Sequence, residues 1–194
     1  MKSNYKRLGD YIQEVNIRNT DLGDIKLLGV SIQKVLIPSI ANIIGTDMST
    51  YKLIKKNQFA YGPVTSRNGD KISVALLDDY EVVMISQAYT SFEVVDKNEL
   101  LPEYLMMWFR RPEFDRYARF MSQGSAREIF GWEEMCNTTL PVPSITKQKE
   151  IVKEAIREWL DEKYVEFGKW TLHGALAALL GALAYFLAVH GGFK

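Results

Sequence analysis

The chain has 194 residues, of which 47% are apolar and 25% are charged. This composition is typical of a globular protein and excludes a disordered one, and the length allows one domain with a real core plus an appendage. The formal net charge is zero, which argues against a protein that coats nucleic acid by bulk charge, although a local basic face stays compatible with it.

The cysteine and histidine content limits the disulfides and metal sites that the chain can form. Cys136 is the single cysteine in the sequence, so no internal disulfide can form and we expect a reducing, cytoplasmic compartment. Two histidines, both in the C-terminal tail, cannot build a zinc-type cluster with it. Residues 1–10 are polar and lack the apolar stretch of a signal peptide, so we expect none.

The first part of the chain is predicted to be mostly β-strand. Apolar residues between Tyr5 and Glu14 recur at spacings of three and four, which predicts a short helix or turn there. The Asn-Gly pair within residues 66–70 favours a hairpin turn. Alternating or β-rich composition predicts strands at residues 25–32, 35–37, 51–55, 57–61, 71–77, 81–85 and 89–95.

The periodicity becomes helical near residue 101. Helices are predicted at residues 101–110 and 112–121, each with a proline in its first turn, and one more helical turn at 132–136. Residues 140–143 form a stiff Pro-Val-Pro connector, and Ser144 caps a charged amphipathic helix that reaches residue 167. The predicted fold class is α+β: a twisted, mostly antiparallel sheet with a few packed helices, followed by a C-terminal helical extension.

The tail, residues 169–194, differs in composition from the rest. Its only formal charges are Lys169 and Lys194, and residues 174–189 are uninterrupted apolar or small residues. As a helix this run would cover about 24 Å, against a hydrocarbon core of about 30 Å. Membrane insertion, a buried self-associating helix and an engineered or aberrant end are the alternatives. We therefore expect a recognition domain at 1–143, a spacer or assembly helix at 144–168 and an apolar helical tail at 169–194.

Two polar clusters flank the predicted helices and carry groups that can contact nucleic-acid bases. The first is Ser86-Gln87-Ala88-Tyr89, where an amide suits adenine and an aromatic ring suits stacking or phosphate contact. The second surrounds Gly124, where Gln123, Ser125 and Arg127 supply an amide, a hydroxyl and a guanidinium group. The structural alternatives are an ordinary strand-end cluster and a helix C-cap at Gly124.

Two further sets of residues are weaker candidates. Arg67 and Asn68 lie at the predicted hairpin tip, which could enter a major groove or be a solvated turn. A group of arginines could face phosphates or be a solvated helix face: Arg110, Arg111, Arg116 and Arg119.

Catalytic and cofactor motifs are missing from the sequence. It contains no G-x-S-x-G, no G-x-x-x-x-G-K-[ST] and no glycine-rich dinucleotide loop. The carboxylate pairs Asp78-Asp79 and Glu133-Glu134 are adjacent in the chain and do not converge as an acid and a base must. We predict a chain that is not an enzyme and binds no cofactor or metal.

A set of short segments, taken in order, carries a resemblance to a known family. Over about Tyr5 to Lys153 the chain resembles one target-recognition domain of a type I restriction-modification specificity subunit. Each segment alone is unspecific, but their order and spacing are specific. They are residues 51–59 (YKLIKKNQF), 86–89 (SQAY), 101–105 (LPEYL), 123–127 (QGSAR), 140–143 (LPVP) and 148–152 (QKEIV).

The resemblance implies a division of labour in which this chain performs no chemistry. In the family, the recognition domain reads one half of a split double-stranded DNA target. A modification subunit brings S-adenosylmethionine and methylates adenine, and a restriction subunit adds ATP-driven translocation and cleavage. The DNA-facing residues expected from the matching segments are Gln87, Tyr89, Gln123, Ser125 and Arg127, and the hairpin argument adds Arg67 and Asn68.

The chain also departs from the family pattern. A full specificity subunit has two recognition domains and two long helices, whereas this chain has one domain and one short helix. A half-subunit that forms a homodimer through its C-terminal helices would restore the whole and read a palindromic split target. The helix from Ser144 would set the half-site distance and bind the modification subunit. The tail has no counterpart in the pattern, so a membrane-tethered or helix-mediated protein-interaction module is the alternative function.

Overall fold

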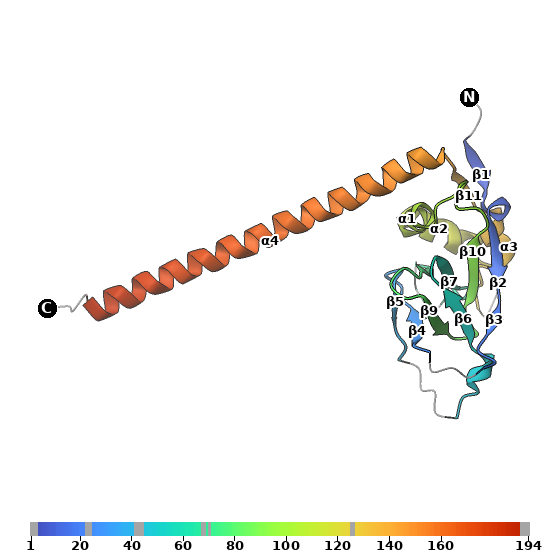
Figure 1. The fold of residues 1–194 in the computed structure, drawn as a ribbon, viewed down its shortest axis with the longest axis horizontal. Coiled ribbons are helices and arrows are strands. Elements are labelled where there is room, and N and C mark those ends of the chain that lie inside the picture. Colours follow the sequence, from blue (N-terminus) through green and yellow to red (C-terminus); the bar gives the residue numbers. More distant parts are fainter. Residues whose placement is uncertain are drawn as a thin grey trace. The chain divides into compact units, whose positions relative to one another are not determined.

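The structure is a computed structural model that describes residues 4–21, 25–40, 45–66, 69, 71–124 and 127–190. The chain divides into two units, Met1–Glu150 and Ile151–Lys194. The first unit, called the body below, contains the described strands and the short helices. The second unit contains most of α4 (Ile145–His190), whose residues 145–150 belong to the body. Figure 1 shows the described elements.

The described strands form three sheets of two, four and five strands. Every pairing among them is antiparallel except that of β4 with β9. The two-stranded sheet pairs β1 (Tyr5–Arg7) with β11 (Thr139–Pro141). The four-stranded sheet has the order β2 (Ile12–Val15), β10 (Thr90–Val94), β7 (Gln58–Gly62), β8 (Ser73–Leu76). The five-stranded sheet has the order β3 (Ile17–Arg18), β6 (Lys52–Lys55), β9 (Val82–Ile85), β4 (Leu27–Val30), β5 (Leu36–Pro38).

Three short α-helices lie between β10 and β11 in the chain: α1 (Pro102–Arg110), α2 (Pro112–Met121) and α3 (Trp132–Asn137). The first two begin with proline, whose fixed backbone angle suits a first helical turn and whose missing N–H would be unpaired there. Two single 3-10 turns, Leu8–Asp10 and Met48–Thr50, complete the described elements. Within the body, Figure 1 shows α1, α2 and α3 in the upper half, near β1 and β11, and the five-stranded sheet in the lower half.

Strand β7 is buried on both faces and separates two apolar clusters. On one face Phe59 stacks on Phe92 with ring centroids 4.7 Å apart, and Phe109 of α1 meets both rings edge-on. On the other face Ala60 belongs to a cluster with Leu77, which follows β8, and with buried residues of the five-stranded sheet: Leu28, Ile54, Val83 and Ile85. Because successive residues of a strand face opposite sides, β7 contacts α1 on one face and the five-stranded sheet on the other.

The α+β class and the predicted strands and helices after residue 25 agree with the structure, whereas the short helix or turn predicted for Tyr5 to Glu14 is present only as a 3-10 turn at Leu8–Asp10. That segment forms β1, a 3-10 turn and β2. Strand β2 pairs with β10, where Gln13 and Glu93 lie opposite each other and share a hydrogen bond of 2.8 Å. Apolar spacing alone favoured a helix, but a free sheet edge at β10 provides the stronger partner.

The structure places one continuous helix, α4, across the predicted spacer helix and the predicted tail. Ser144 precedes it, and its hydroxyl accepts the N–H of Lys147 at 3.4 Å, as expected of an N-cap. In the part of the chain that the structure describes, no helix has the combined length and apolarity needed to cross a bilayer.

Candidate nucleic-acid interface

The first candidate element is the Gln87 turn, which we define as Ser86–Tyr89. It connects β9 to β10 and is closed by the Tyr89 N–H, which donates to the Ser86 carbonyl at 3.1 Å. The Ser86 hydroxyl accepts the Ala88 N–H at 3.3 Å. Gln87 and Ala88 are exposed at the apex of this turn. The Gln87 amide therefore reaches solvent from a closed, hydrogen-bonded loop.

The Gln87 turn also accepts a hydrogen bond from a buried lysine. Lys52 of β6 is 6% exposed, and its Nζ donates to the Tyr89 carbonyl at 2.9 Å. Burial lowers the pKa of Lys52 from the usual lysine value. The half-buried Tyr89 ring packs on the cluster around Ala60, and its hydroxyl accepts the Val30 N–H at 3.3 Å. Tyr89 thus braces the turn, and its predicted contact with DNA stays a prediction.

The second candidate element is the Arg127 loop, defined as residues 123–129. Gln123 and Ile129 pair in antiparallel fashion, with N–H to carbonyl distances of 3.0 and 2.8 Å in the two directions. Arg119 of α2 forms an ion pair with Glu128. Gln123 and Arg127 are both exposed. The ladder and the ion pair fix the base of the loop and leave its polar side chains outside.

Gly124 makes the tight backbone of the Arg127 loop possible. Its φ is +119°, a region that L-residues rarely adopt. A Cβ at this position would lie 2.3 Å from the Arg127 carbonyl oxygen. Glycine is therefore required at position 124, because the backbone of Arg127 approaches it too closely for a side chain.

The two elements lie at the same end of the four-stranded sheet. Strand β10 begins at Thr90, directly after the Gln87 turn, and Thr90 is paired with Tyr61 near the end of β7. Shortly beyond that end, Val64 bridges to Ile129 of the Arg127 loop. The Tyr89 ring lies beside Gly62, where an added Cβ would be 3.6 Å from Cε1. The end of β7 therefore joins both elements.

A buried ion pair joins further segments near this end. Lys34, in the turn between β4 and β5, has a side chain 5% exposed and lies 2.7 Å from Asp115 of α2. Its Nζ also donates to the Phe109 carbonyl at the end of α1. Asp115 accepts the Ile72 N–H at 3.1 Å, just before β8. The pair of Lys34 and Asp115 thus links the β4–β5 hairpin to α1, to α2 and to the end of the β7–β8 connection.

Three predicted site residues lie outside the described residues: Arg67, Asn68 and Ser125. The hairpin predicted around Arg67 and Asn68 is present, because β7 and β8 pair in antiparallel register from Phe59 with Leu76 to Gly62 with Ser73. Its connection, residues 63–72, includes the predicted turn at residues 66–70. Gly69 has the positive φ, +65°, that such a connection needs.

The sequence interpretation missed the residues that brace the two elements. Lys52, Lys34 and Asp115 are all charged residues that the fold buries or half-buries. One signal was available for Lys52, which lies two positions before Ile54 in a β-rich run and so shares the face of the strand on which Ile54 is buried. The partner of Lys34 lies 81 positions further along the chain, which no local pattern can reveal.

The described residues show no arrangement suited to a metal. No group of three or more His, Cys, Asp or Glu residues among them could hold an ion. Burial raises the pKa of the Cys136 thiol, which is the opposite of what an activated thiolate requires. The exposed groups described above can form hydrogen bonds and ion contacts with a ligand.

Comparison with known proteins identifies the fold. No protein-family model matches the chain, and no curated protein matches it significantly. Two solved structures match over almost its whole length. One, from a study of complex assembly and conformational transition of the type I R-M system, is 12% identical with a TM-score of 0.57 and covers 96% of this chain and 46% of that one. The other, the HsdS subunit from Thermoanaerobacter tengcongensis, is 17% identical with a TM-score of 0.64 and covers 98% of this chain and 50% of that one.

These matches confirm, at the level of fold, the resemblance inferred from the order of the sequence segments. The chain spans about half the length of the structures that it matches. It therefore has the fold of one half of a type I restriction-modification specificity subunit.

Proposed function

We propose that this chain is the non-catalytic specificity component of a type I restriction-modification complex and that its body reads one half of a split double-stranded DNA target. The observation that carries the proposal is the placement of the Gln87 turn and the Arg127 loop at one end of the sheet, where Gln87, Gln123 and Arg127 are exposed and the backbone on either side of them is hydrogen-bonded. Fixed polar groups discriminate between base pairs because they cannot adjust to the wrong one.

The side chains have the chemistry that base recognition requires. The Gln87 and Gln123 amides can each donate to and accept from the edge of adenine. The Arg127 guanidinium can bind guanine or phosphate through two parallel hydrogen bonds. With a formal net charge of zero for the whole chain, such local contacts must supply what bulk charge does not.

The modification and restriction subunits are the proposed partners. Among the described residues, no group of acidic, histidine or cysteine side chains could hold a metal ion. The proposal assigns methyl transfer and cleavage to those subunits and not to the body. In this assembly the specificity component selects the DNA site and the modification subunit carries out adenine methylation there.

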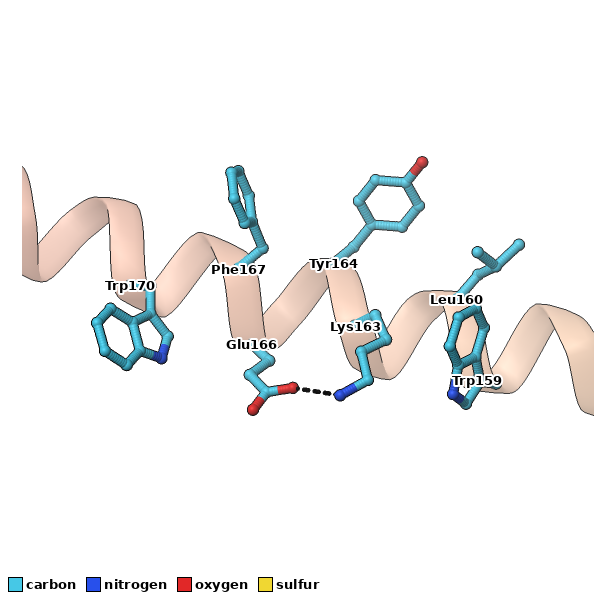
Figure 2. A pocket seen from close by; sticks show the side chains of 7 residues that line it. All are labelled: Trp159, Leu160, Lys163, Tyr164, Glu166, Phe167 and Trp170. Atoms are coloured by element: carbon cyan, nitrogen blue, oxygen red, sulfur yellow. Dashed lines mark hydrogen bonds and ion pairs between the residues drawn. The ribbon is translucent and has the colours of Figure 1, made fainter. Parts of the chain in front are cut away.

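The proposed third partner is a second copy of this chain, bound through α4. Figure 2 shows large side chains along one part of this helix: Leu160, Tyr164 and Phe167 project to one side in this view, and Trp159 and Trp170 to the other. Phe167 is 69% exposed and Trp170 is 76% exposed. Among these side chains, the Lys163 Nζ and a Glu166 carboxylate oxygen form an ion pair at 2.8 Å. The pair leaves no net charge among the apolar side chains.

The second copy is favoured because it brings an identical set of exposed apolar side chains on α4. Apolar surface of this extent is typical of an interaction site, and a homodimer pairs the same surface of both copies. Such a dimer would read a palindromic split target.

Selection from a pool of random DNA duplexes tests the proposed function. The full chain is used alone and together with a type I modification subunit. We expect enrichment of two short conserved blocks, inverted relative to each other and separated by a fixed number of unspecified base pairs. A pool that shows no enriched block with or without the modification subunit would contradict the proposal.

The alternative is a membrane-tethered or helix-mediated protein-interaction module, favoured by the composition of residues 169–194. Removing residues 172–194 distinguishes the two functions. A truncated chain that still enriches the same half-site blocks supports DNA recognition by the body. A full chain that partitions into detergent and enriches no DNA supports the alternative.

A further inference from the structure

Lys52 contacts both ends of the Gln87 turn, one with its backbone and the other with its side chain. Its backbone lies opposite Ile85, the last residue of β9 and the residue that directly precedes the turn. Its Nζ donates to the carbonyl oxygen of Tyr89, the last residue of the turn, at 2.9 Å. One residue of β6 therefore holds the chain where the turn begins and where it ends.

The same turn is the connection between two sheets of the body. Strand β9 belongs to the five-stranded sheet and β10 to the four-stranded sheet. Strand β6, which carries Lys52, pairs with β9 in the five-stranded sheet. Because its amino group bonds to the residue that precedes β10, Lys52 links the two sheets at the point where Gln87 is exposed.

The bond to Tyr89 also explains why a lysine can occupy this buried position. Lys52 is 6% exposed, and burial of an amino group costs free energy unless the group is hydrogen-bonded. Leucine or methionine could fill such a space without that cost. Burial lowers the pKa of Lys52, and the Glu14 carboxylate acts in the opposite direction. What lysine offers here and an apolar residue lacks is a donor for the Tyr89 carbonyl.

Gln87 lies between the two points at which Lys52 holds the chain. A third fixed point is the Tyr89 hydroxyl, which accepts the Val30 N–H at 3.3 Å. A side chain that recognises a base edge has to be held within about 0.5 Å of its productive position. A loosened turn would therefore keep the Gln87 amide but lose its discrimination between bases.

We propose that Lys52 is a positioning residue for DNA specificity: its bond to the Tyr89 carbonyl fixes the backbone of the Gln87 turn so that the Gln87 amide reads one base position. The inference rests on the proposed function and deepens it, because it adds a residue that sets specificity without touching DNA. Lys52 acts through Gln87 and contributes nothing to the base positions read by the Arg127 loop.

Four variants of the full chain separate positioning from general stability. Lys52→Met keeps most of the side-chain length and removes the donor to Tyr89. Lys52→Gln keeps N–H donors on a side chain that is shorter by one bond. Lys55→Met removes the same charge from an exposed residue of the same strand and is the matched control. The double variant Gln87→Ala/Lys52→Met tests whether Lys52 acts through Gln87.

Competition binding is measured on the duplex selected from the random pool and on its single-base variants, with the modification subunit present. Thermal melting by circular dichroism shows that each variant is folded. Gln87→Ala should lower the preference at one base position by about tenfold, and Lys52→Met and Lys52→Gln should each lower it at that same position by about threefold or more. Lys55→Met should stay within about twofold of the wild type, and in the Gln87→Ala background Lys52→Met should change no base preference by more than about twofold.

Folded Lys52 variants that keep the full preference at the Gln87 position would overturn the inference. So would a Lys52→Met variant that weakens every base position equally, or that adds a further loss in the Gln87→Ala background, because general loosening of the body would do the same. If Lys52→Met does not fold, Lys52→Gln takes its place in both backgrounds. A wild type without base preference contradicts the proposed function, whereas a wild type that selects DNA but reads no base through Gln87 overturns only this inference.

Discussion

Arg127 is the exposed cation of the Arg127 loop and the residue best suited to a bidentate contact with DNA. Arg127→Ala should weaken binding to the selected duplex by about 1–3 kcal/mol and relax preference at one base position. Arg127→Lys should restore little of this, because a point charge cannot replace a planar fork. Competition binding on single-base variants of the selected duplex measures both effects.

Arg116→Ala is the control for Arg127. Arg116 is exposed on α2, where it pairs with Glu113 at 3.4 Å. We expect this change to leave base preference intact, even if it alters overall affinity slightly through phosphate contact. Equal base preference in wild type and Arg127→Ala would remove Arg127 from the site.

Gly124 should be intolerant of substitution for a backbone reason. In Gly124→Ala the new Cβ meets the Arg127 carbonyl oxygen at a separation that real atoms do not adopt, so the loop must rearrange. We expect lost base preference with a melting temperature close to that of the wild type, because the loop lies outside the core. Gly45→Ala is a control of equal backbone character: its φ is +74° and no atom lies within 4 Å of the added Cβ. Retained base preference in Gly124→Ala would contradict the role given to this loop.

For single residues, the sequence predicted the exposed polar side chains better than the buried contacts that hold their loops in place. Gln87 and Gln123 were identified from residue type and neighbouring turn signals, and the structure places both in solvent. The supporting contacts of Lys52 and Lys34 could not be predicted, because each depends on a partner distant in the chain: Tyr89 for one and Asp115 for the other.

Among the elements, the turn between β4 and β5 depends on the buried pair of Lys34 and Asp115. Burial lowers the pKa of Lys34 from the usual lysine value, while the hydrogen bond with Asp115 acts in the opposite direction. Lys34→Met or Asp115→Leu alone should destabilise the body by about 3–5 kcal/mol, because each leaves one buried charge unpaired.

The double variant Lys34→Met/Asp115→Leu should be more stable than either single variant, because no unpaired charge remains buried. Urea unfolding of the four proteins measures the coupling. Additive losses in the double variant would show that the two side chains do not act as a pair.

The elements themselves were predicted where sequence periodicity and tertiary pairing agree. The strands around Phe59 and the two proline-initiated helices are examples. The prediction failed for Ile12–Val15, where spacing favoured a short helix or turn but pairing with β10 determines a strand. The spacer helix and the helical tail, which were distinguished by composition, lie in one continuous helix, α4.

At the scale of the whole molecule, the apolar face of α4 should hold two copies together. Phe167→Glu places a charge within that face and should shift the full chain from dimer to monomer. Val165→Glu is the matched control: Val165 is 57% exposed and lies about 200° around the helix from Phe167. Light scattering after size-exclusion chromatography measures the mass of each species. A dimer that survives Phe167→Glu, or a wild type that is already monomeric, would contradict pairing through this face.

The whole arrangement was only partly accessible from the sequence. The order of the motifs indicated the fold, and the structure shows that three of them meet: Leu101 and Tyr104 of one segment contact Gln148 and Pro141 of two others. What the sequence did not predict is that the end of β7 brings the Gln87 turn and the Arg127 loop together, because that requires the register of β7 with β10 and the bridge from Val64 to Ile129.

The most direct test of base recognition by these two elements is competition between the selected duplex and a scrambled duplex of the same composition. The wild-type chain, with the modification subunit, should prefer the selected duplex by about a thousandfold or more at physiological salt. The double variant Gln87→Ala/Arg127→Ala should lose most of this preference and keep its affinity for the scrambled duplex within about threefold. A double variant that discriminates between the two duplexes as strongly as the wild type would contradict the account.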